Sequence, residues 1–236
     1  MSASTAAMAS PSANAQRAMW DRQWRTAGIQ FVVFSIIIAF IYGDVPQVGA
    51  SGDVLAAFYG AHRTRILIGS TLAGLNLLNL LWFAASLRNT LVEAGQEGWG
   101  TAATASSAAF GALYFLLITV GAALAYSIAG SGNGALASGL NDLGWALAVL
   151  ISFPRAMLIM SGVFGLWRAG MISNSLFTAG VVAVVLGVLG GTTWMSDGFW
   201  APDGIFSRFV SPILLLVWVV VVSRVLLTRP AARAGW

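Results

Sequence analysis

Apolar residues fill most of this chain in long runs that short polar stretches separate. The runs cover about 26–42, 64–87, 103–129, 140–167, 171–194 and 209–227. A helix of roughly 20 apolar residues is long enough to cross the hydrocarbon core of a bilayer. The pattern therefore predicts an all-α, polytopic integral membrane protein with six transmembrane helices in one bundle.

The polar and low-complexity segments predict the domain limits. Residues 1–16 are rich in Ala and Ser, which favours a disordered tail. They lack the basic start and apolar core of a signal peptide. We expect one membrane domain over 17–229, followed by a cytoplasmic tail at 230–236. Residues 54–62, just before the second run, are predicted to form a short helix at the membrane interface.

The composition agrees with lipid as the main solvent. Hydrophobic residues make up 58% of the chain and charged residues 8%, whereas soluble domains carry roughly 25% charged residues. The chain has no Cys and a single His, His62. These counts exclude disulfides and thiolate metal sites and disfavour a histidine-ligated metal centre. We therefore expect the lipid bilayer as a partner and no cofactor or metal.

The positions of the arginines predict the orientation. All twelve basic residues are arginine, and cytoplasmic loops carry an excess of such charges, so the net charge of +4 does not call for nucleic-acid binding. With the N-terminus inside, the inner group is Arg17, Arg22, Arg25, Arg88, Arg168, Arg224, Arg229 and Arg233, and the outer group is Arg63, Arg65 and Arg208. This imbalance predicts both termini in the cytoplasm and a bacterial plasma membrane location.

The fourth run carries a charge in its middle. Arg155 follows Pro154 there, and a charge at the bilayer centre costs about 3 kcal/mol on insertion scales. At about 1.5 Å per residue, Arg155 and Asn79 lie at similar depths, which predicts a hydrogen bond between them. Asn76 shares the helical face of Asn79, and Tyr114 in the third run is a further candidate partner. Such a group is either a structural clamp between helices or a counter-charge for an anionic headgroup or substrate.

Charged residues also collect at the predicted outer rim of the membrane. They are Asp44, Asp53, His62, Arg63, Arg65, Asp142, Asp197, Asp203 and Arg208. One interpretation is a ring of interfacial salt bridges that holds the loops. The other is the mouth of a pocket, where His62 or Asp142 moves a proton and the arginines bind phosphate or carboxylate. The candidate ligand-binding residues are Asp142, Arg155, Asn76, Asn79, His62, Arg63, Arg65, Asp203 and Arg208, and no catalytic residue is assigned.

Glycine and tryptophan positions add two expectations. Gly187 and Gly191 have the small-xxx-small spacing that allows close contact between helices. Trp82, Trp145 and Trp218 lie deep in their runs, where packing is the default role. Such rings could also face a carbocation in an isoprenoid enzyme, through cation–π attraction.

Several stretches resemble a group of actinobacterial six-span membrane proteins of unknown function. The stretches are SGDVLAAFYGAHRTRILIG (51–69), LWFAASLR (81–88), FPRA (153–156) and GFWAPDGIFS (198–207). The resemblance covers about Ser51–Arg229. It implies the six-span topology and a recurring outer loop built on Ala201–Gly204, and it implies no reaction and no catalytic residue.

Three classes of function remain open. The first is a non-catalytic accessory or scaffold subunit of a membrane complex, or a binder of a lipid-like ligand, with a partner protein or a second copy beside it. The second is a membrane enzyme that acts on a lipid or isoprenoid through an outer polar pocket. The third is a small-molecule transporter, which would want intramembrane acids or broken helices in matching places. An enzyme should show acid and base groups facing one cavity, and a subunit should show a helix face too small or too polar for lipid.

Overall fold

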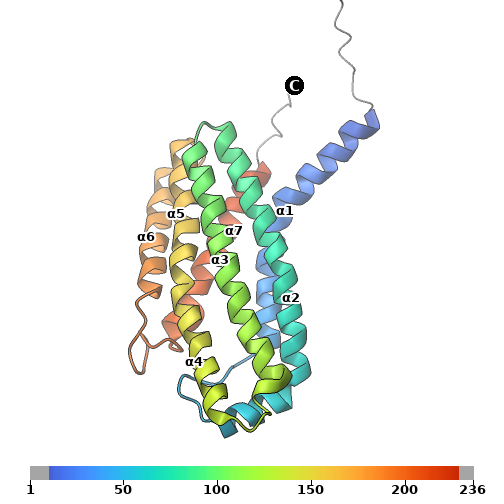
Figure 1. Ribbon diagram of the computed structural model, residues 1–236. Coiled ribbons are helices and arrows are strands. Elements are labelled where there is room, and N and C mark those ends of the chain that lie inside the picture. The colour runs from blue at the N-terminus through green and yellow to red at the C-terminus, as the bar shows by residue number, and fades with distance from the viewer. Residues whose placement is uncertain (1–10, 229–236) are drawn as a thin grey trace, which may run out of the picture.

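The computed structural model describes residues 11–228, with side chains from Thr26 onward, and all its regular elements are helices (Figure 1). In chain order these are α1 (Pro11–Tyr42), α2 (Gly52–Glu93), α3 (Glu97–Ala123), η1 (Leu124–Ile128), α4 (Gly134–Leu150), α5 (Ser152–Arg168), α6 (Asn174–Gly190), η2 (Phe206–Val210) and α7 (Ser211–Thr228). The elements η1 and η2 are single π-helical turns. The predicted all-α class is confirmed for the described residues.

Two helices are longer than their apolar runs. Helix α1 begins at Pro11, inside the tail predicted to be disordered; residues 1–10 and the predicted tail at 230–236 lie outside the described residues. Helix α2 begins at Gly52, so the separate interfacial helix predicted over 54–62 is instead its first part. The Ser51 hydroxyl accepts the Val54 N–H as an N-cap, and no proline follows to end the helix before the membrane run.

The fourth apolar run is divided into two helices. Helix α4 ends at Leu150 and α5 begins at Ser152, with Ile151 between them. Pro154 lies in the first turn of α5, where a missing N–H is tolerated, and it cannot donate to the Leu150 carbonyl. Together α4 and α5 form one interrupted apolar helix of 35 residues.

The helices form a ring in which each contacts the next, in the order α1, α2, α3, α5, α6, α7 and back to α1. In Figure 1 the N-terminal part of α1 extends away from this bundle, and both ends of the described chain lie at its upper end. We call this upper end, which also carries residues 94–96 and 169–173, the turn end. The lower end carries the connections 43–51, 129–133 and 191–205, and we call it the loop end.

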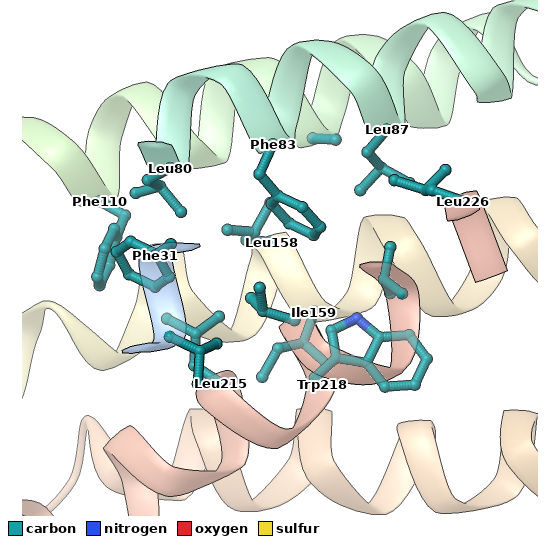
Figure 2. Packing of buried hydrophobic residues seen from close by; sticks show 14 of the residues in the cluster. Phe31, Leu80, Phe83, Leu87, Phe110, Leu158, Ile159, Leu215, Trp218 and Leu226 are labelled. Atoms are coloured by element: carbon teal, nitrogen blue, oxygen red, sulfur yellow. The ribbon is translucent and has the colours of Figure 1, made fainter. Parts of the chain in front are cut away.

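A single large apolar core fills the interior of the ring (Figure 2). Its buried members come from α1, α2, α3, α5 and α7, and α6 adds partly buried residues at the margin. Phe83 on α2 and Leu158 on α5 meet near its centre, and Trp218 of α7 closes one side. A smaller cluster at the loop end joins Leu55 of α2 to Leu124 of η1 and Ala137 of α4.

The outside of the bundle is apolar as well. Large exposed side chains include Phe34 and Phe40 on α1, Leu75 and Leu78 on α2, Val182 and Val185 on α6, and Ile213 and Val217 on α7. Contiguous apolar surface of this extent is incompatible with water as the solvent. Four helical stretches in the described residues are long and apolar enough to cross a membrane, and Thr26–Tyr42 and Asn174–Gly190 are shorter apolar helices. The protein is therefore a helical membrane protein.

Candidate functional site

One face of α4 holds the segment Gly43–Ala50, which we call the strap, across the loop end. Four side chains, spaced as neighbours on a helix, bind strap backbone groups. The Asn141 amide donates to Gln47 O at 2.8 Å, the Ser138 hydroxyl donates to Ala50 O at 2.7 Å, and the Trp145 indole donates to Pro46 O at 3.0 Å. The Asp142 carboxylate accepts the Gly49 N–H at 2.8 Å. Asp142 therefore serves to position a loop.

The strap is also bound from the other side, near α7. Asp203 accepts the Val48 N–H at 3.3 Å, and Arg208 pairs with Asp44 at 3.0 Å. The Arg208 guanidinium lies over the rings of Trp145 and Phe209, 5.5 and 5.9 Å from their centroids.

The outer rim accordingly holds loops, as one of the two interpretations expected, but chiefly through backbone hydrogen bonds. Arg208–Asp44 is the single salt bridge among the described residues, and the Asp44 side chain is 93% exposed. An exposed pair of this kind contributes about 0–1 kcal/mol. The predicted ring of salt bridges is therefore wrong, because the acids Asp142 and Asp203 accept peptide N–H groups instead.

Ser138, Asn141 and Trp145 were not among the predicted site residues. The signal was present, because positions 138, 141, 142 and 145 fall on one face of an otherwise apolar helix. Packing was the default role expected for Trp145, and its indole N–H in addition donates to a carbonyl.

Arg155 is buried inside the bundle and binds α7. Its side chain is 8% exposed, and its Nη1 donates to Ser211 Oγ at 2.7 Å. Its guanidinium lies 5.9 Å from the centroid of the Phe110 ring, while its Nε has no partner in the structure. Tyr114 stacks on the same Phe110 ring, with centroids 5.7 Å apart. No carboxylate among the described residues lies within salt-bridge distance of this cation.

The end of α6 packs against the hydroxyl that binds Arg155. Ser211 Oγ is 3.3 Å from Ser152 Oγ, and Gly190, the last residue of α6, lies against both serines. A β-carbon at Gly190 would lie 2.8 Å from Ser211 Oγ and 3.0 Å from Ser152 Oγ. Arg155 and the two serines therefore form a polar clamp between α5 and α7, with the end of α6 packed beside it.

The predicted bond between Arg155 and Asn79 is absent, because Asn79 binds its own helix neighbour. Asn79 Nδ2 donates to Asn76 Oδ1 at 3.2 Å. Asn76 Nδ2 in turn reaches α1, with Phe31 O and Ser35 Oγ each at 3.1 Å. The two asparagines share one face, as predicted, and they clamp α2 to α1.

The remaining rim residues are not brought together into one pocket. Arg65 donates from Nη2 to Tyr42 O at 3.2 Å, and the His62 ring packs edge-on against Phe58 with centroids 5.0 Å apart. Arg63 is exposed and lies over the Tyr126 ring, 5.5 Å from its centroid.

A groove of about 390 Å³ begins at Arg63. It is lined by Arg63, Thr64, Leu67, Ile68, Thr71 and Leu72, all on α2. These residues span nearly three helical turns, so the groove runs along the helix from a basic end to an apolar end.

Over residues 26–228, no group of three or more His, Asp and Glu side chains is placed to hold a metal ion. The acids nearest the strap already accept hydrogen bonds, and the nearest ring to His62 is apolar. Asp142, Asp203 and Arg208 of the rim hold the strap, and Arg155, Asn76 and Asn79 bind helices to one another.

Comparisons with known protein families, with curated proteins and with solved structures find no match to this chain. The resemblance to actinobacterial six-span proteins therefore stays a prediction.

Proposed function

We propose that this protein is a non-catalytic subunit of a membrane assembly and that α3 carries the contact with its partner. The observation that supports the proposal is the outward face of α3. Between Val92 and Phe115 no large apolar side chain is exposed. The exposed residues of α3 in this stretch include Thr101, Thr104, Ala105, Ala108, Ala109 and Ala112.

The spacing of these alanines places them in one stripe. Ala105, Ala108, Ala109 and Ala112 are three and four residues apart, so they lie on a single face of α3. Small residues let two helix backbones approach closely in lipid, where packing rather than water drives association. The lipid-facing side of α2 differs, because it carries Leu75, Leu78 and Leu81. The α3 face suits a transmembrane helix of another protein better than it suits acyl chains.

An Ala108→Trp variant tests this contact. The indole would keep the partner helix away, and overpacking of about 1–3 kcal/mol corresponds to a loss of bound partner of roughly tenfold. The measurement is native mass spectrometry after gentle extraction from the protein's own membrane. Leu78→Trp, on the exposed face of α2, is the matched control and should keep the partner.

Three results would count against this subunit role. They are a wild-type protein that carries no second polypeptide, a partner that Ala108→Trp retains, and a partner that Leu78→Trp loses to the same degree. If the mass spectrum shows a second copy of this chain, the partner at α3 is the protein itself and the assembly is a homo-oligomer.

We further propose six membrane-spanning segments, with both termini in the cytoplasm of a bacterium. The ring arrangement supports this count, because the two shorter apolar helices α6 and Thr26–Tyr42 lie beside longer ones. The arginine distribution supports the orientation, since the turn end holds Arg88 and Arg168 and the ends of the chain.

Single-cysteine labelling tests the orientation, and the chain contains no other cysteine. A membrane-impermeant maleimide should label Asp197→Cys in intact cells. It should label Gly98→Cys only after permeabilisation, because that residue lies at the turn end. Both positions are exposed, and nothing lies within 4 Å of a β-carbon at Gly98. The reverse pattern would mean the opposite orientation in the membrane. Labelling of both positions in intact cells would contradict the three spans proposed between them, because an odd number of spans places the two residues on opposite sides.

An enzymatic or a transporting role has less support from the geometry. Asp142 and Asp203 of the rim bind the strap, and Asp44 pairs with Arg208. A ligand-binding role is favoured by one specific observation, the groove beside Arg63.

A further inference from the structure

We propose that the groove on α2 is a binding site for an anionic phospholipid of the outer leaflet. Arg63 and Thr64 would bind its phosphodiester, and its acyl chain would lie along Leu67, Ile68, Thr71 and Leu72. This site is independent of the subunit role of α3 and can exist without it.

The cation at the head of the groove is free to bind a ligand. Arg63 is exposed and forms no salt bridge among the described residues. It lies over the ring of Tyr126, a contact that orients the guanidinium through the ring face and leaves its N–H donors available. The planar fork of these donors matches two phosphate oxygens.

The neighbouring arginine, Arg65, has a structural role, which Arg63 lacks. Arg65 is half-buried and donates to the carbonyl of Tyr42, beside the positive-φ residue Gly43. Arg63 makes no such contact with the backbone of residues 11–228, although it lies only two residues earlier. Arg65 therefore holds α1 against α2, whereas the Arg63 side chain is exposed at the surface.

The length and polarity of the groove fit a lipid rather than a free anion. From Arg63 to Leu72 the helix rises about 14 Å. The lining begins with a guanidinium and a hydroxyl and continues with Leu67, Ile68, Thr71 and Leu72, where the Thr71 hydroxyl is occupied by the Leu67 carbonyl. A soluble phosphate would use only the first turn and leave the apolar part empty. A phospholipid fills both parts, because its charged phosphodiester is joined directly to an acyl chain, just as the basic end of the groove continues into the part lined by Leu67 and Ile68.

The test is lipid retention in native mass spectrometry of the full chain from nanodiscs. These contain equal phosphatidylglycerol and phosphatidylcholine. We expect Arg63→Gln to reduce the phosphatidylglycerol adduct by about fivefold, the effect of roughly one basic residue near an anionic surface. Thr71→Trp should reduce it similarly, because the ring fills the groove without changing the charge. Arg168→Gln, an exposed arginine at the turn end, is the matched control and should retain the adduct.

Several results would overturn the proposal. They are an unchanged adduct in Arg63→Gln, an equal loss in Arg168→Gln, and equal retention of phosphatidylcholine by the wild type. Displacement of the lipid by millimolar inorganic phosphate would make the site a simple anion site. Tryptophan fluorescence during heating verifies that each variant is folded, and a variant that melts early is replaced by Arg63→Lys, which should keep part of the adduct.

Discussion

The Phe83→Ala variant is expected to lose about 3–5 kcal/mol of folding free energy. Phe83 is 2% exposed and lies against Leu158 near the centre of the core (Figure 2). Its ring also faces α1, since a β-carbon at Gly28 would lie 2.6 Å from it. Removal of the ring leaves a cavity between three helices, and its neighbours lose their dispersion contacts.

Thermal unfolding in detergent, followed by the fluorescence of the ten tryptophans, measures this loss. Phe115→Ala on α3 is the control, because it removes the same ring from a position that is 56% exposed. Lipid or detergent replaces the contacts of Phe115, so its melting temperature should stay close to that of the wild type. Equal shifts in the two variants would mean that Phe83 does not occupy the core.

The Gly187→Val variant is expected to weaken the contact between α6 and α5 by about 1–3 kcal/mol. A β-carbon at Gly187 would lie 3.0 Å from Ala156 Cβ and 3.4 Å from Ala156 Cα. The second atom belongs to the backbone, so only a displacement of the whole helix makes room. The predicted close approach at Gly187 is therefore confirmed, and Gly191 lies similarly against the Phe153 ring.

Gly139→Val on α4 is the matched control for this substitution. Gly139 lies in a helix, as Gly187 does, but it is exposed, and nothing lies within 4 Å of a β-carbon there. The control should melt at or slightly above the wild-type temperature, since valine is a better helix former than glycine. A loss in Gly139→Val as large as that in Gly187→Val would contradict a packing origin.

The helices themselves could be predicted from the sequence, because each apolar run is long enough to specify a helix without knowledge of its neighbours. The limits were less accurate. Helix α2 starts well before its run, since a capped and uninterrupted segment extends it. The single span predicted over 140–167 is divided at Ile151, because a proline is favoured in the first turn of a helix and Pro154 takes that position in α5.

Contacts between helices could not be predicted in the same way. Depth placed Arg155 and Asn79 at one level, but depth does not specify how each helix is rotated about its axis. The actual partner of Arg155 is Ser211, at the start of α7. It comes after η2 and the irregular connection 191–205, and the path of such a connection cannot be predicted from hydrophobic periodicity. The strap-binding face of α4 could have been predicted from the sequence, because its four polar side chains follow helical spacing. It was missed because a tryptophan and a serine in an apolar helix ordinarily only pack.

The clamp between Arg155 and Ser211 also has a consequence for the order of synthesis. The two residues are 56 positions apart, so at about 5–20 residues per second the ribosome reaches Ser211 roughly 3–11 s after Arg155. During that interval α5 carries a charge whose hydroxyl partner does not yet exist. The end of α6, which packs against Ser152, is made before Ser211 but adds no hydrogen-bond partner for the arginine among the described residues. The last helix of the chain therefore completes the polar site on α5, and a chain interrupted before α7 leaves Arg155 without its hydroxyl partner.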